Sequence, residues 1–409
     1  MKLSACLKNS EYLKSSGLSS NALSYYYFFI IAFTLIFFQT LQVYFFWGLV
    51  RYVIIQSLVF VSIILLISLG KLKIRKTTNQ QLFSIFLLWI VFLYCMLTNN
   101  WQENLLDTVI LFEISILILL PSYIKKDLYK CLLNCFVYLN TISLFFWFLM
   151  LAGVPLPNTY AENMDYKFYN YYFFLFDTDY EFWIFPRYSG VFSEPGHVSM
   201  ISAFFLYINR FKWNSFHTIV LLTVVLMSFS LAGYLLAFVS YVLHLILNFK
   251  EKKKIIIVVL LSLGFLGYTI YSFNDGDNVM NELILSRLEY DDGDIKGNNR
   301  ESASFEGVYH WFLDRGNLLF GEGARILKKW NVEQTASWRD FFVRFGILGL
   351  ILTGLLYILI LSSNRSKAAL GFLFIYFVSF LQRPHALYLY ELVLFILAMT
   401  VIENSKKRI

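Results

Sequence analysis

The sequence predicts an all-α protein that crosses a membrane many times. Of its 409 residues, 58% are hydrophobic and only 15% are charged, whereas about a quarter of the residues in a soluble domain carry a charge. The apolar residues fall in long runs, and a run of about 18 or more with few charges is typical of a transmembrane helix. Because the runs are continuous rather than alternating, they predict helices and not the strands of a barrel.

Twelve spans are expected, and together they form a single integral membrane domain that covers residues 1–409. Their approximate limits are 25–43, 46–69, 81–98, 106–121, 129–152, 190–208, 215–232, 233–249, 255–273, 341–362, 368–382 and 387–402. The polar segment 1–21 contains no short apolar stretch that ends in a cleavage site, so the first span is expected to act as the targeting signal.

The positive charges predict the orientation of the spans. Every second connection is basic, and these basic segments hold most of the 34 Lys and Arg residues: the N-terminus, 71–76, 125–130, 209–212, 250–254, 364–367 and the C-terminal tail. Cytoplasmic loops carry such an excess of Lys and Arg. Both termini are therefore expected in the cytoplasm. Because the net charge of +7 is distributed in this way, it does not indicate a nucleic-acid partner.

Two long loops are expected on the outer side, at 153–189 and at 274–340, and the second is expected to contain short helices. The first is rich in aromatic residues (KFYNYYFFLFDTDYEFWIF), which argues against disorder. Aromatic residues at this density suit the membrane interface and also suit stacking on sugar rings. Both interpretations stay open at this point.

Neither a disulfide framework nor a metal site is expected. None of the four cysteines, Cys6, Cys95, Cys131 and Cys135, lies in the two long loops. Three D-x-D triplets occur in the outer loops, and such triplets can hold a divalent ion against a diphosphate. Acidic loops also produce them by chance, and none of the three follows the first span. We therefore expect neither a metal ion nor a cofactor.

The first group of residues with possible chemistry is R-Y-S-G-V-F-S-E-P-G-H, residues 187–197, where the first long loop meets the sixth span. Ser193 is expected to cap a helix that has Pro195 in its first turn. The N-terminus of a helix favours anions, and Arg187 offers a fork of donors that suits phosphate. Glu194 is a possible base, and His197 lies about one turn further along. A cap and an arginine alone could be structural.

The second group lies in the second long loop. Arg300 precedes a segment in which Phe305, Val308, Tyr309 and Phe312 would form one apolar face of a helix. Ser302, Glu306 and His310 would share a polar stripe of the same helix. A carboxylate one turn before a histidine can orient it as a base, although a solvated face is the simpler interpretation.

Further cations follow near the outer ends of the last spans. Gly321 and Gly323 predict a tight turn. Arg339 would begin the tenth span, and Arg344 lies one or two turns inside it, where a charge is costly and often functional, or else reaches back to the interface. Arg383 and His385 lie between the last two spans.

The stretch 187–197 resembles the R-x-x-G-x-F-x-E-P signature of the bacterial O-antigen and capsule repeat-unit polymerases, the Wzy type. The segment S-F-S-L-A-G-Y (228–234) is similar to their S-x-S-x-x-G element. GEGARI and the later FGILGLILTGLLY resemble the end of their second loop. The resemblance covers most of residues 185–360 and the overall topology.

The resemblance implies a metal-independent glycosyltransferase of the GT-C-like class in the bacterial inner membrane. Its substrate would be an oligosaccharide repeat unit on undecaprenyl pyrophosphate. The enzyme would move the growing chain onto a new lipid-linked unit on the periplasmic side, for O-antigen, capsule or exopolysaccharide. A chain-length regulator and a flippase of the same pathway are the implied candidate partners, beside the lipid bilayer itself.

This chemistry assigns roles to the residues above. A pyrophosphate leaving group needs positive charge, for which Arg187, Arg300 and Arg339 are the first candidates. The acceptor hydroxyl needs a base, and the candidates are Glu194, slightly favoured, and His310. His197, Arg344 and Arg383 are further candidates for substrate binding.

Three rival functions stay open. An O-antigen ligase would use the same donor with a different acceptor, but the E-P pair of the first motif favours a polymerase. A flippase for lipid-linked units would show paired halves and cations in its central spans. A scaffolding membrane protein would not need several arginines on one acidic outer surface.

Overall fold

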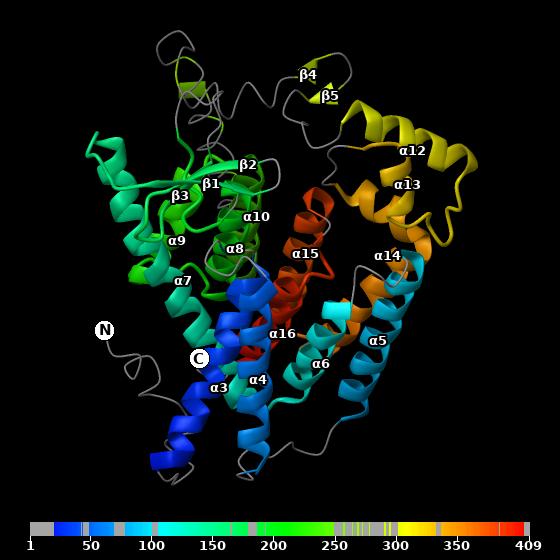
Figure 1. Cartoon of the computed structure of the whole chain (residues 1–409), viewed down its shortest axis with the longest axis horizontal. Coiled ribbons are helices and arrows are strands. Elements are labelled where there is room, and N and C mark those ends of the chain that lie inside the picture. Colours follow the sequence, from blue (N-terminus) through cyan, green and yellow to red (C-terminus); the bar gives the residue numbers. More distant parts are fainter. Residues whose placement is uncertain are drawn as a thin grey trace. The chain divides into compact units, whose positions relative to one another are not determined.

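The computed structural model describes most of the chain. The described residues are 20–41, 43, 49–68, 78–99, 105–163, 166–178, 186–192, 194–248, 302–332, 337–383 and 385–404, with single positions or pairs between 257 and 295. Within them the protein is mostly helical (Figure 1). Four of the described helices are long and apolar enough to cross a membrane: α3 (Ser20–Thr40), α5 (Asn79–Asn99), α7 (Ser122–Leu151) and α14 (Trp338–Ser362). The chain is thus a multi-pass membrane protein.

The chain divides into two compact units. The first unit contains 1–135, 301–373 and 380–409, and the second contains 136–300 and 374–379. The division falls inside α7, which contributes its first half to one unit and its second half to the other.

In the first unit, helices pack in pairs. α3 packs on α4 (Leu49–Ser68), and α5 packs on both α14 and α6 (Leu105–Leu119). The last helix, α16 (Leu389–Asn404), contacts α3, α6 and α14. The ends of α15 (Lys367–Gln382) also belong here. Two short helices, α12 (Ala303–Arg315) and α13 (Arg325–Lys329), come from the second long loop.

In the second unit, α8 (Pro195–Ile208) is the central helix and packs against α9 (Phe216–Met227) and α10 (Leu231–Asn248). The middle of α15 joins it, because Tyr376 stacks on Phe204 at 5.5 Å between ring centroids. All residues of α8 except His197 are buried. A helix that is apolar all round is expected in such a position.

The first long loop contains a small antiparallel sheet that the sequence did not predict. Its strands are β1 (Thr159–Asn163), β2 (Tyr166–Asn170) and β3 (Phe176–Thr178), in that order (Figure 1). A two-stranded ladder of β4 (Tyr290–Asp291) and β5 (Asp294–Ile295) lies in the second loop. The expectation of an all-α protein therefore holds for the body of the molecule and misses these strands.

Described helices occupy eleven of the twelve expected spans, and the expected span 255–273 lies almost entirely outside the described residues. The expected span 129–152 is too short, because α7 begins at Ser122 and includes the expected basic connection 125–130. The expected limits 190–208 and 215–232 are too wide. α8 begins only at Pro195, and α9 ends at Met227. The reason is local: residues 186–192 form turns, and Phe229 has a left-handed backbone (φ 45°) that interrupts the helix before α10. That all twelve spans cross the membrane stays a prediction.

Candidate functional site

Arg187 is held against the turn between α9 and α10. Its Nε donates a hydrogen bond to the carbonyl oxygen of Ser228 at 3.0 Å. The next amide along the chain, that of Tyr188, donates to the carbonyl of Met227, also at 3.0 Å. The two segments that resemble the polymerase signatures, 187–197 and 228–234, thus meet in space although about 40 residues separate them.

Helix α7 fixes the same turn from the other side. The hydroxyl of Tyr188 donates to Oδ1 of Asn140 at 2.9 Å, and its ring packs edge-on against Trp147 at 5.8 Å. Burial raises the pKa of Tyr188, so its hydroxyl stays protonated and keeps this bond over the physiological pH range. The sequence did not single out Asn140, although an amide within an apolar span was a usable signal.

The sheet completes the support of the turn. The amide of Phe176 in β3 donates to the carbonyl of Gly190 at 2.7 Å, and Ser189 Oγ donates to the carbonyl of Phe176 at 2.7 Å. Arg187 therefore projects from a segment that is bonded on three sides, to β3, to α7 and to the α9–α10 turn. Such a segment positions a side chain far better than a free loop does.

Helix α8 begins directly after this turn. Its N-cap is Glu194 and not Ser193, which lies outside the described residues, and Pro195 occupies the first helical position. The Glu194 side chain makes no capping hydrogen bond. Glu194 and His197 are both half-buried, one turn apart, and the His197 amide donates to the Glu194 carbonyl at 3.1 Å. The first-turn position expected for His197 is confirmed.

In S-F-S-L-A-G-Y, the serine side chains accept hydrogen bonds from backbone amides, and the glycine allows close packing of two helices. Ser228 Oγ accepts from the amide of Ser230, and Ser230 Oγ accepts from the amide of Gly233, each at 3.3 Å. The second bond caps the start of α10. Gly233 lies directly against Ser199 of α8, and any side chain at position 233 would collide with that serine. This element therefore holds the starts of α8 and α10 together.

A second cluster forms in the first unit around Glu306. Its Oε1 accepts from a terminal nitrogen of Arg339 at 2.8 Å, and its Oε2 lies 3.7 Å from Nε2 of His310. The Arg339 guanidinium also lies over the ring of Tyr309, 4.9 Å from its centre. The expected pairing of Glu306 with His310 is confirmed. The contacts of Arg339 with Glu306 and Tyr309 were not predicted, because they join residues about 30 positions apart.

The short helix that carries this cluster has the expected faces. Phe305, Val308 and Phe312 are buried together with Val343 of α14. Ser302 caps α12 by accepting from the amide of Phe305. The remaining stripe faces outward, and the His310 side chain is 75% exposed. Packing on α14 fixes the helix, so the stripe is ordered although it is solvated.

Arg344 and the nearby glycines belong to a break in α14. Arg344 Nε donates to Asp340 at 2.9 Å, so a carboxylate one turn earlier already neutralises this charge. Gly346 leaves the helical conformation with φ 62°. The tight turn expected at Gly321 and Gly323 is confirmed, because both have left-handed backbones. The substrate-binding role of Arg344 stays a prediction.

The remaining candidates lie apart in sequence from these clusters. Arg383 is half-buried at the end of α15, and His385 stacks on Tyr388 with ring centroids 4.5 Å apart. Arg300 lies outside the described residues. Arg187, Glu194 and His197 belong to the second unit, and Arg339, Arg344, Arg383 and His310 belong to the first. The expected convergence of Arg187, Arg300 and Arg339 on one ligand stays a prediction.

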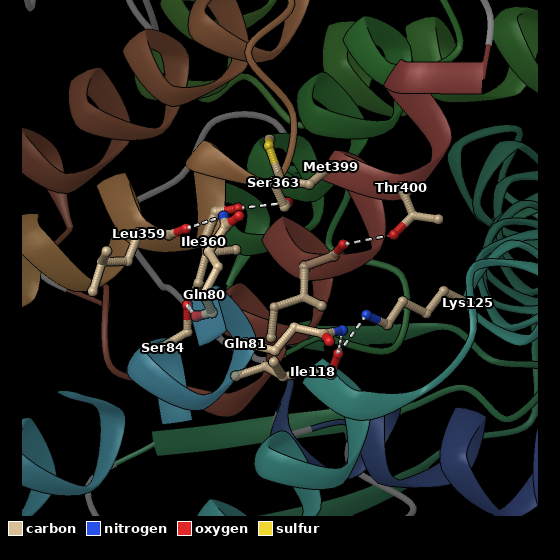
Figure 2. Close-up of a pocket in the computed structure, with 11 residues that line it drawn as sticks. Gln80, Gln81, Ser84, Ile118, Lys125, Leu359, Ile360, Ser363, Met399 and Thr400 are labelled. Carbon is tan, nitrogen blue, oxygen red and sulfur yellow. Dashed lines mark hydrogen bonds between the residues drawn. The ribbon is translucent and has the colours of Figure 1, made fainter. Parts of the chain in front are cut away.

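A polar cavity lies in the first unit, where the starts of α5 and α7 meet the ends of α6, α14 and α16 (Figure 2). The buried Lys125 donates to the carbonyl of Ile118 at 2.8 Å, and the amide of Gln81 donates to the same oxygen at 3.1 Å. Gln80 donates to the carbonyl of Leu359. These side chains satisfy carbonyls at helix ends. With a volume of about 60 Å³, the cavity admits a few water molecules and is too small for a glycan.

Within the described ranges, no three His, Cys, Asp or Glu side chains gather as metal ligands would. Comparisons with protein-family models, with curated proteins and with solved structures give no match to this chain.

Proposed function

We propose that this protein is an oligosaccharide repeat-unit polymerase. It transfers a growing glycan from undecaprenyl pyrophosphate onto a new lipid-linked repeat unit, on the periplasmic face of a bacterial inner membrane. The observation that carries the proposal is the junction of two signature-like segments: Arg187, which precedes α8, is bonded to Ser228, which directly precedes α10.

This junction suits a diphosphate. The start of a helix carries a positive partial charge, and the turn to which Arg187 is bonded leads directly into the start of α10. The guanidinium adds a full charge that does not titrate in the physiological range. Pyrophosphate departs as an anion, so charge stabilisation contributes more to its departure than protonation does.

The reaction needs one proton acceptor. The acceptor hydroxyl oxygen forms a bond to the anomeric carbon of the donor as the bond from that carbon to pyrophosphate breaks, and the hydroxyl proton passes to a base. Glu194 is the first candidate because it is half-buried at the start of α8, seven residues after Arg187. His310 is the second, and its Nε2 lies 3.7 Å from Oε2 of Glu306.

The test uses a strain that lacks the gene and is complemented by variants. Arg187→Lys keeps the charge but loses the planar fork of donors, so we expect long polymer to fall by more than tenfold on a silver-stained gel, with single repeat units remaining. Arg315→Lys is the matched control. Arg315 is exposed in the last turn of α12, and its replacement is expected to leave the polymer unchanged.

The same assay separates the rival functions. Loss of a ligase leaves long polymer on the lipid carrier, and loss of a flippase leaves no units on the outer side. Polymer of normal length and amount from Arg187→Lys, at normal protein level, would refute the proposed role of Arg187.

A further inference from the structure

The sheet of the first long loop has two unlike faces. Side chains alternate between the faces along a strand, and Phe168 and Asn170 of β2 are buried with Phe176 of β3. Tyr169 of β2 therefore belongs to the opposite face, as does the following Tyr171. This outer face is only partly covered, and Tyr160 of β1 is 47% exposed.

A row of two tyrosines and one aspartate crosses the outer face. In the register of the strands, Tyr160 is paired with Tyr169, and Tyr169 is paired with Asp177. Directly paired residues share a face. The rings of Tyr160 and Tyr169 meet edge to face at 5.5 Å. The row therefore presents two aromatic rings and a carboxylate side by side.

The connection from β2 to β3 is built to display more aromatic surface. Tyr172, Phe173 and Phe174 all have left-handed backbones, with φ of 57°, 47° and 63°. Non-glycine residues adopt this conformation at a cost of about 1–2 kcal/mol each. Tyr172 is 44% exposed, and Phe173 is stacked on Phe146 of α7 at 4.0 Å. The stack anchors the turn in which Tyr172 is exposed.

We propose that this outer face binds the glycan part of the lipid-linked substrate. Sugar rings present C–H faces that pack on tyrosine rings, and their hydroxyls donate hydrogen bonds to a carboxylate. The tyrosine–aspartate row offers both features. The proposal rests on the proposed function, because it names the subsite through which that enzyme holds its oligosaccharide.

The composition of the row favours a glycan over the bilayer. Tyrosines alone would suit the membrane interface. A carboxylate directly beside the tyrosines of the row would be costly in lipid and would be repelled by anionic headgroups. Asp177 is directly opposite Tyr169, so the rings cannot enter the bilayer without bringing this charge toward it.

The strand that carries Asp177 is bonded to the segment of Arg187. β3 carries Asp177 and, one residue earlier, Phe176, which bonds to Ser189 and Gly190 in the segment of Arg187. A glycan on the row would thus extend from a pyrophosphate at Arg187. The tyrosine–aspartate row and Arg187 both lie in the second unit.

The test measures glycan binding directly on the full-length protein in lipid nanodiscs. The probe is a size-fractionated oligosaccharide from partial hydrolysis of the host's own surface polysaccharide. The double variant Tyr160→Ala/Tyr169→Ala is expected to bind it about tenfold more weakly, because it removes both rings on which the sugar would pack. The double variant Tyr160→Phe/Tyr169→Phe keeps both rings and is expected to lose much less. Thermal unfolding of both variants establishes that the sheet is intact.

The outcomes separate this proposal from the proposed function. Unchanged affinity in the alanine variant would overturn the glycan subsite, whatever its polymer yield. Arg187→Lys is expected to keep its affinity for the free oligosaccharide while polymer is lost; if polymer persists, the proposed function fails even if the sheet binds sugar. Quenching of a Tyr160→Trp variant by lipids with brominated acyl chains would assign the face to the bilayer and would also overturn the subsite.

Discussion

At the scale of single residues, the candidate site depends on small side chains as much as on charged ones. Gly233 allows α10 to approach α8 at Ser199, one turn or so beyond the Ser228 carbonyl to which Arg187 is bonded. A larger residue at this position would separate the helix termini that are proposed to bind the diphosphate. The glycine of the signature therefore has a packing role.

The variant Gly233→Ala tests this role. Its methyl group would overlap Ser199, so we expect a loss of about 1–3 kcal/mol in the free energy of unfolding, as for other overpacked sites. Ser199→Gly removes the overlapping atoms, and the double variant is expected to regain most of the loss. Thermal unfolding in detergent measures both effects. Equal destabilisation in the single and double variants would contradict the close contact.

The identity of the base is also a question of single residues. Replacement of a general base lowers rates by about 10²–10⁴, so we expect Glu194→Gln to lower the polymerisation rate by about that factor. The measurement is polymer formed per unit time from purified lipid-linked units. Should His310→Asn cause the larger loss instead, the role passes to the Glu306–His310 pair, which is solvent-exposed and joined at 3.7 Å.

At the scale of elements, α14 is a broken helix whose freed backbone groups are satisfied by the second loop. The amides of Ile347 and Leu348 donate to the carbonyls of Leu318 and Leu319, at 2.9 and 3.0 Å. The backbone amides of Glu322 and Gly323 in turn donate hydrogen bonds to carbonyls that precede the break in α14. Irregular backbone at membrane depth is tolerated only where neighbours satisfy it in this way. The break thus fixes the loop that leads to Arg325 and α13.

Two glycines of α14 provide a matched test of the break. Gly346 has φ 62°, and a methyl group there would lie 2.5 Å from the Leu319 carbonyl oxygen. Gly346→Ala is expected to lower the free energy of unfolding by about 1–3 kcal/mol. Gly354 lies in the same helix with open space around it, so Gly354→Ala should have no destabilising effect. The measurement is thermal unfolding of the two variants side by side. Equal melting temperatures would exclude a strained break in α14.

At the scale of the whole molecule, helix direction in the first unit follows the expected alternation. The starts of α5 and α7 and the ends of α6, α14 and α16 meet around one cavity (Figure 2). The opposite end of α5 lies beside the second loop, where the Asn99 side chain accepts from the amide of Ala324 at 2.9 Å. The helix ends next to the basic segments thus gather at one end of this unit.

Reporter fusions test the predicted topology. Green fluorescent protein joined after residue 409 is expected to fluoresce, because the C-terminus is predicted to be cytoplasmic. Alkaline phosphatase inserted near Pro157 in the first long loop is expected to be active, because that loop is predicted to be periplasmic. The reverse pattern would invert the topology and place the candidate site on the side of the membrane that lacks the expected substrate.

The sequence by itself determined the membrane class, the approximate places of eleven apolar helices with ends in error by up to seven residues, and the faces of α12. Each of these depends on hydrophobicity or spacing along a short segment, where neighbours in sequence are neighbours in space. The pairing of Glu306 with His310 is of this kind, since one helical turn brings them together.

Only the tertiary structure decided which distant residues meet. The bond of Arg187 to Ser228, the contact of Arg339 with Glu306, and the row Tyr160–Tyr169–Asp177 all join separate elements. The sheet was not predicted because its strands are short and because the long aromatic run obscured the alternation of side chains between the two faces. Such contacts arise from packing and strand register, which depend on the whole chain, and a local pattern of residue types does not contain them.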